Sequence, residues 1–138
     1  MATAVLRGSG QRRLLQGHPW IYRSDIHAVK GSPEAGEVVK IVAANRRFLG
    51  RGTYNARSQI ALRVLTTEDE AVDTAFLMGR IAAASARRGA REGPDAAYRV
   101  VFSEGDLLPG LIVDRYGPVA VAQFLTAGME RLREPILE

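Results

Sequence analysis

The chain has 138 residues, a formal net charge of +4 and no cysteine. This length suits one ordinary domain or two small ones. The lack of cysteine excludes disulfides, thiolate metal sites and a cysteine nucleophile within this sequence, and two histidines do not favour a histidine-rich metal centre. No apolar run approaches the roughly eighteen residues of a membrane span, and the N-terminus lacks the layout of a signal peptide. We therefore expect a cytoplasmic location, no membrane partner and no metal.

The charge is distributed unevenly along the chain. Residues 1–66 have a balance of +8 and residues 67–138 a balance of −4, and seventeen of the nineteen basic residues are arginine. Such an asymmetry predicts that the N-terminal half faces a polyanion, and arginine suits bidentate phosphate contacts. A GC-rich or thermophilic genome would also raise the arginine content, and composition alone leaves both explanations open.

The first half of the chain has the pattern of a small β-barrel. The expected strands cover residues 3–7, 36–44, 48–54 and 59–65. Several short strands with frequent glycines and one short helix are typical of a closed or partly closed barrel. Gly50 and Gly52 occupy alternate positions of one expected strand, which predicts a close backbone approach or a bend.

A short helix and an aromatic segment follow the first strand. The helix is expected over residues 11–16, with Arg12 and Arg13 pointing outward and Gly17 ending it. Pro19 then forces His18 out of the helical region. Trp20 has two interpretations: a core anchor, which we favour, or a stacking platform for a base.

The second half predicts one long helix packed against an antiparallel sheet. Thr66 or Thr67 should begin the helix, because Thr67 and Glu70 have the spacing of a capping box. Three short runs separated by glycine- and proline-containing turns then indicate an antiparallel meander. These runs cover residues 98–102, 111–116 and 119–125. The almost wholly apolar middle run predicts a central strand buried on both faces, and the whole chain is expected to be mixed α+β.

Three carboxylates lie near the ends of these strands: Glu104, Asp106 and Asp114. In one interpretation they shape turns, as Asp does after glycine, or pair with Arg99 or Arg115. In the other they face a substrate or another domain. The second interpretation predicts that Asp106→Asn changes stability by less than about 0.5 kcal/mol, as for ordinary surface substitutions.

The last eleven residues begin a new amphipathic pattern at Gly128 that is unresolved at Glu138. We take this as an indication that the sequence is part of a longer protein. The expected division is a barrel over residues 1–66, an α+β domain over 67–127, and the start of a helix over 128–138 that leads into a further domain.

Two groups of motifs resemble a known family. The segments QRRLLQGHPWIY (11–22) and GRGTYN (50–55) are similar to the N-terminal PUA domain of bacterial S-adenosylmethionine-dependent RNA methyltransferases that make 5-methylcytosine in large-subunit ribosomal RNA. The segment SEGDLLPGLIVDRYG (103–117) resembles the strand-strand-helix-strand-strand connector domain that follows in that family. The resemblance covers nearly all of the chain, and its second motif is the more specific.

The resemblance implies the RNA-recognition part of such an enzyme without its catalytic domain. The family's catalytic cysteine and its glycine-rich cofactor loop have no counterpart here, so this chain should hold no catalytic residue and no cofactor, while the parent would use S-adenosylmethionine. The implied partners are ribosomal RNA, the missing methyltransferase domain and a second copy in a homodimer. Together with the charge asymmetry, this predicts an RNA-binding set: Arg12, Arg13, Gly17, His18, Arg23, Arg47 and Arg51.

Two alternatives stay open at this point. The first is a free-standing RNA-binding protein of PUA type. The second is an interaction domain in which the basic half is ordinary solvated surface. Salt dependence of binding separates the second alternative from the RNA-binding hypotheses, because phosphate contacts release counterions.

Overall fold

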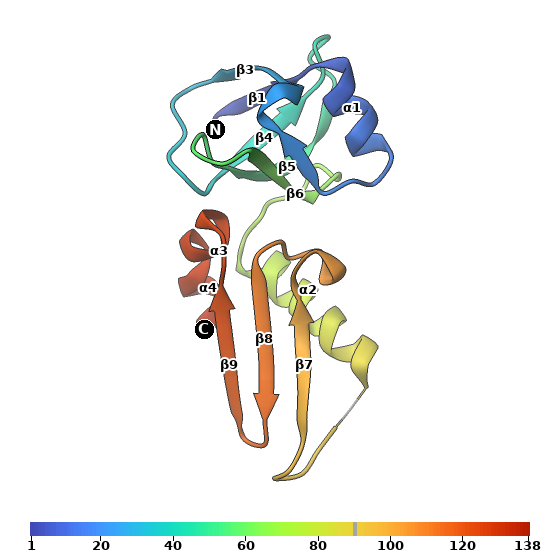
Figure 1. The fold of residues 1–138 in the computed structure, drawn as a ribbon, viewed down its shortest axis with the longest axis vertical. Coiled ribbons are helices and arrows are strands. Elements are labelled where there is room, and N and C mark those ends of the chain that lie inside the picture. The colour runs from blue at the N-terminus through green and yellow to red at the C-terminus, as the bar shows by residue number, and fades with distance from the viewer. Residues whose placement is uncertain (90) are drawn as a thin grey trace. The chain divides into compact units, whose positions relative to one another are not determined.

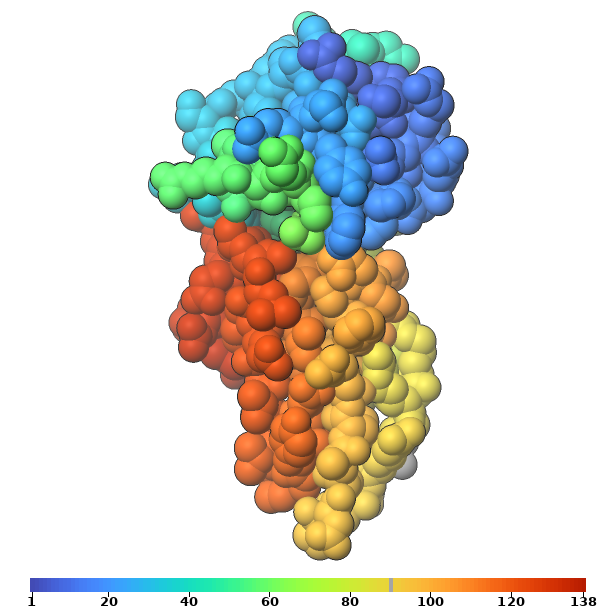
Figure 2. Space-filling model, viewed as in Figure 1, coloured from blue at the N-terminus to red at the C-terminus, as the bar shows by residue number. Residues whose placement is uncertain are grey.

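A computed structural model describes residues 1–89 and 91–138 of the chain, drawn as a ribbon in Figure 1 and as a space-filling view in Figure 2. The contacts divide it into two units, Met1–Val72 and Asp73–Glu138. Each unit has its own sheet and its own helices, and we describe each by itself. The mixed α and β composition expected from the sequence is confirmed.

The first unit is a curled six-stranded sheet with one helix. Its elements are β1 (Thr3–Leu6), α1 (Gly8–Leu15), β2 (Trp20–Tyr22), the 3-10 turn η1 (Arg23–Asp25), β3 (Ile26–Lys30), β4 (Glu37–Val42), β5 (Phe48–Tyr54) and β6 (Ile60–Thr66). The strand order is β2-β6-β5-β4-β1-β3. Neighbouring strands are antiparallel except β1 and β4, which run parallel. The sheet curls into a half-barrel, as Figure 1 shows.

The core of this unit fills the inside of the curl. It consists of fully or nearly buried aliphatic side chains from five strands, α1 and the residue after β4: Ala4, Leu6, Leu14, Ile21, Val39, Ile41, Ala43, Leu49 and Leu62. Trp20 is only half-buried, so its expected role as the core anchor is wrong. Because neighbouring strand residues point to opposite faces, the inward position belongs to Ile21, which is fully buried.

The two glycines of β5 allow a close backbone approach, as the sequence predicts. A Cβ atom on Gly50 would lie 2.5 Å from the carbonyl oxygen of Thr66, and one on Gly52 would lie 2.5 Å from that of Arg63. Real Cβ atoms do not come this close to a carbonyl oxygen. The bend of β5 against β6 therefore depends on glycine at both positions.

The second unit is a three-stranded antiparallel sheet with helices. Its elements are α2 (Thr74–Arg88), β7 (Ala97–Phe102), the 3-10 turn η2 (Ser103–Asp106), β8 (Leu111–Tyr116), β9 (Val119–Phe124), α3 (Ala127–Arg131) and α4 (Arg133–Leu137). The strand order β7-β8-β9 confirms the meander with its middle run at the centre. Figure 1 shows α2 running along β7.

The long helix begins at Thr74, so the expected start at Thr66 or Thr67 is wrong. Glu70, which suggests a capping box, and its neighbour Asp69 instead bind side chains of the first unit, to which both residues belong. Asp69 pairs with Arg51 at 2.7 Å, and Glu70 accepts a hydrogen bond from the Thr66 hydroxyl at 2.6 Å. The actual N-cap is Asp73, whose carboxylate accepts from the backbone N–H of Phe76 at 2.9 Å.

Only one face of the second sheet is covered. Val101 and Leu111 are fully buried, as are Leu77 and Ala84 of α2. On the opposite face the registers place Phe102, Tyr116 and Val121, all of which are exposed. The prediction that the central strand is buried on both faces is therefore wrong: β8 is central within the sheet but half-covered. Among the described residues, no helix is long and apolar enough to cross a membrane.

Candidate nucleic-acid interface

The helix α1 and the segment after it carry four of the seven residues predicted to bind RNA. We call Arg12, Arg13, Gly17 and His18 the α1 surface; Arg23, in η1, instead donates to the Ala56 carbonyl oxygen at 2.8 Å. Arg12 and Arg13 lie in the last turn of α1, and together with Ser9 and Gln16 they line a shallow hollow of about 260 Å³. Gly17 has φ +80°, which favours glycine and turns the chain toward His18.

Arg13 is held in place by its own unit. Its Nε donates to the Oδ2 atom of Asp25 at 3.2 Å, and its guanidinium lies 4.7 Å from the centre of the Tyr22 ring. The same Asp25 oxygen accepts from the backbone N–H of Tyr22 at 3.2 Å. Asp25 is buried, and through these two hydrogen bonds it links α1 to the turn after β2. Arg12, by contrast, is exposed and has no ion pair within the part of the chain that the structure describes.

An aromatic ring with basic neighbours continues this surface. The His18 ring lies 6.2 Å from that of half-buried Trp20, and the Arg63 guanidinium lies 5.7 Å from the Trp20 ring. Arg63 was not among the predicted residues. It faces Trp20 because β2 and β6 pair in the register Trp20↔Arg63. Nothing in the local sequence reveals that partnership, since the two residues are far apart in the chain.

Arg47 and Arg51 do not join the α1 surface. Arg47 is exposed in the turn between β4 and β5, and Arg51 lies within β5. The Arg51 guanidinium is bound by Asp69 at 2.7 Å and contacts the Met1 sulfur at 3.0 Å. With its side chain 18% exposed, Arg51 is the least available of the predicted contacts.

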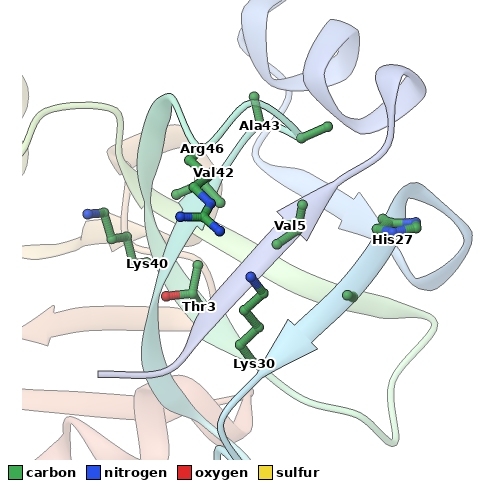
Figure 3. Close-up of a pocket in the computed structure, with 10 residues that line it drawn as sticks. Thr3, Val5, His27, Lys30, Lys40, Val42, Ala43 and Arg46 are labelled. Carbon is green, nitrogen blue, oxygen red and sulfur yellow. The ribbon is translucent and has the colours of Figure 1, made fainter.

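A second group of basic residues was missed by the sequence interpretation. Lys30, Lys40, Arg46 and His27 line a groove of about 610 Å³ across β1, β3 and β4 (Figure 3). They come from β3, β4 and the turn after β4, and only the pairing of these strands with β1 brings them together. No short motif in the sequence signals this arrangement.

The Asp106 carboxylate is enclosed by donors of its own unit. It is 2% exposed, and it accepts from Arg87 at 2.6 Å, from Arg88 at 2.7 and 3.0 Å, and from the Phe102 N–H at 2.6 Å. Burial alone would raise the pKa of Asp106, but the hydrogen bonds from Arg88, Arg87 and the Phe102 N–H hold it well below its ordinary value. Such a residue stabilises the unit, and the expectation that Asp106→Asn leaves stability unchanged no longer holds.

The other two carboxylates are also engaged within the second unit. Arg99 donates to both oxygens of Asp114, at 2.8 and 3.1 Å, and these hydrogen bonds lower the pKa of Asp114. This is the pairing expected if Asp114 has a structural role. Glu104 accepts from the Ser103 hydroxyl at 2.6 Å. Contact of these carboxylates with a substrate or another domain stays a prediction. Among the described residues, no three or more acidic or histidine side chains are grouped to hold a metal ion.

Comparisons with known proteins agree with the architecture of the first unit. Residues 5–67 match the family model described as a PUA-like domain. The chain is 43% identical over 135 residues to the ribosomal RNA large subunit methyltransferase I of Shewanella amazonensis, covering 96% of this chain and 34% of that protein. It is 42% identical over 138 residues to the protein of the same name from Tolumonas auensis, covering 98% and 35%. The chain thus spans about a third of the length of these curated relatives.

Solved structures extend the likeness to both units. A structure from Streptococcus mutans, provisionally assigned as a SAM-dependent methyltransferase, superposes with a TM-score of 0.83 at 16% identity, covering 99% of this chain and 36% of that one. A second, provisionally assigned as a methyltransferase and solved with SAH, gives 0.84 at 16% identity. At this identity the likeness concerns the fold alone. The N-terminal unit, with its curled sheet, is thus similar to a PUA-like domain over residues 5–67.

Proposed function

We propose that this chain is the RNA-recognition part of an S-adenosylmethionine-dependent methyltransferase that modifies large-subunit ribosomal RNA. The observation that carries the proposal is the half-buried Trp20 ring, which lies 6.2 Å from the His18 ring of the α1 surface and 5.7 Å from the Arg63 guanidinium. Basic side chains beside an aromatic ring are what proteins use to hold a nucleic-acid backbone and to stack a base. The relatives named as ribosomal RNA methyltransferases support the choice of RNA.

The finer parts of the proposal concern the parent protein. We infer that its target is the C5 position of a cytosine, that it uses S-adenosylmethionine and that it acts in the cytoplasm as a homodimer. The catalytic domain would be contributed by sequence beyond these 138 residues, and this chain by itself would not methylate RNA. The coding sequence downstream of Glu138 separates this hypothesis from a free-standing RNA-binding protein.

Arg12 offers the sharpest test of RNA binding. It is exposed and carries no ion pair among the described residues, so its removal should not disturb the fold. We expect Arg12→Gln to weaken binding of a labelled RNA hairpin about fivefold, the factor that one charge contact at about 4 Å in water implies. The plot of log K against log salt should flatten by about 0.7 to 0.9, the value for one lost phosphate contact. Fluorescence anisotropy at several salt concentrations measures both quantities.

Arg57→Gln is the matched control, because Arg57 is exposed in the turn between β5 and β6 and lies outside the α1 surface. It removes the same charge from the same unit. Equal weakening by the two substitutions would mean that only net charge matters and that the α1 surface has no special role. Failure of the unsubstituted chain to bind RNA at low salt would favour the interaction-domain alternative.

A further inference from the structure

The groove across β1, β3 and β4 has an apolar floor and a basic rim. Val5, Ala28 and Val42 line the floor, and Lys30, Lys40, Arg46 and His27 stand around it. Among the residues that the structure describes, no acidic one lines the groove. Figure 3 shows Lys40, Thr3 and Lys30 side by side across the three strands, with the Arg46 side chain reaching toward them. None of these four basic residues belongs to the α1 surface.

The strand register explains why these cations meet. Thr3 of β1 pairs with Lys30 of β3 on one side and with Lys40 of β4 on the other. Directly opposed residues have Cβ atoms about 4.5–5.5 Å apart and point to the same face. Lys30 and Lys40 therefore project from one row of the sheet, separated by the small hydroxyl side chain of Thr3.

The next residue of the same row, Arg51 of β5, has an acidic partner, which the two lysines lack. Lys40 also pairs with Arg51 of β5, and like charges directly opposite one another destabilise a sheet. The charge of Arg51 is offset by Asp69 at 2.7 Å. In residues 1–89 and 91–138 no carboxylate pairs with Lys30, Lys40 or Arg46. The groove thus concentrates positive charge that the unit itself leaves uncompensated.

We propose that this groove is a second RNA-binding site, in which Lys30, Lys40 and Arg46 bind successive backbone phosphates of a single strand. Lys30 and Lys40 project from one row of the sheet, and a strand laid across β3, β1 and β4 along the open groove could contact both. The half-buried Phe48 ring lies 5.8 Å from the Lys40 Nζ atom, which provides the aromatic neighbour that single-strand sites combine with cations. The inference rests on the proposed function, since it assumes that the chain binds RNA.

The test uses the 138-residue chain and a labelled oligouridine of about 12 nucleotides, a length within the range of known single-strand sites. Lys30→Gln with Lys40→Gln should weaken binding about fivefold for each lysine and flatten the salt slope by about 0.7 for each. The double substitution removes like-charge repulsion, so thermal unfolding should occur at the same temperature or a higher one. Lys30→Arg with Lys40→Arg keeps the charges and should restore binding.

The control removes two charges elsewhere: Arg57→Gln with Arg91→Gln, both exposed and outside the groove. If the lysine variant binds oligouridine as tightly as this control, the groove takes no phosphate and the inference is overturned. The proposed function survives that outcome if Arg12→Gln still weakens binding of the hairpin, and it fails together with the inference if neither RNA binds the unsubstituted chain.

Two further binding measurements test which kind of anion occupies the groove. Inorganic phosphate at equal phosphate concentration should compete poorly, because only a strand engages several cations at once. Full competition by free phosphate would reduce the groove to a simple anion site and overturn the assignment to RNA. Binding of polyglutamate that depends on both lysines, without binding of oligouridine, would assign the groove to an acidic protein and also overturn it.

Discussion

Replacing Asp106 should destabilise the second unit strongly, because each of its oxygens serves two donors. One oxygen accepts from Arg87 and Arg88, at 2.6 and 3.0 Å, and the other from Arg88 and the Phe102 N–H, at 2.7 and 2.6 Å. In Asp106→Asn one oxygen becomes an amide NH₂ group. Whichever way the amide is turned, that group then faces two N–H donors and accepts from neither.

The cost follows from the bonds that are lost. Hydrogen bonds to a charged group contribute about 1.5–3 kcal/mol each, so two lost bonds would cost about 3–6 kcal/mol. The Arg87 side chain is 51% exposed and the Arg88 side chain 25%. Hydrogen bonds from both side chains to water therefore offset part of the lost free energy. We expect a net loss of about 3 kcal/mol. A unit of this size has a total stability of only about 3–10 kcal/mol.

Urea unfolding followed by circular dichroism measures the loss, and a thermal scan should show a midpoint lower by roughly 12–24 °C. Hydrogen exchange read by mass spectrometry should place the change in β7, η2 and the last turn of α2. The control is Asp95→Asn, which alters an exposed carboxylate of the same unit. If Asp106→Asn unfolds within about 0.5 kcal/mol of this control, the four hydrogen bonds do not stabilise the unit and the reasoning is wrong.

Two further predictions concern pH and close packing. The pKa values of Asp106 and Asp114 are lowered in the folded chain, so their stabilisation is complete above their ordinary value of 3.8 and is lost as the pH falls through the folded values. Urea midpoints should therefore drop below about pH 4, less steeply in Asp106→Asn, and an equal acid dependence in that variant would contradict the assignment. Gly52→Ala should cost about 1–3 kcal/mol through overpacking, because its Cβ would meet the Arg63 carbonyl oxygen at 2.5 Å. Gly79→Ala in α2 meets nothing within 4 Å and should stabilise by about 0.5–1 kcal/mol; the same sign for both would refute the packing argument.

The strands were the most predictable part of the fold. Residues 48–54 and 111–116 form β5 and β8 with the expected bounds, because the polar segments 45–47 and 55–58 delimit β5, and Pro109-Gly110 and Gly117-Pro118 delimit β8. The start of α2 was not predictable, since Thr67 and Glu70 match a capping box by spacing. The local pattern does not show that Arg51 of β5 binds Asp69, or that Thr66 of β6 binds Glu70, in place of a helix cap.

The candidate site likewise contains some residues that a local sequence pattern groups and others that only contacts between strands bring together. Arg12, Arg13, Gly17 and His18 lie within seven consecutive residues, so a local pattern sufficed to group them. Arg63, Lys30 and Lys40 reach their surfaces only through the strand register, which a single sequence does not specify. The burial of Asp106 likewise depends on α2 bringing Arg87 and Arg88 to the turn after β7.

The placement of β1 between β3 and β4 bears on how the chain folds during synthesis. β1 leaves the ribosome before the other strands of its unit, yet its parallel partner β4 follows 37 residues later, as the pair Thr3↔Lys40 shows. At about 5–20 residues per second this interval lasts roughly 2–7 s. Over that time the apolar run of Ala4, Val5 and Leu6 has only the later edge strand β3 as a sheet partner. Its shortness and the adjoining charge of Arg7 limit the association of nascent chains through this strand.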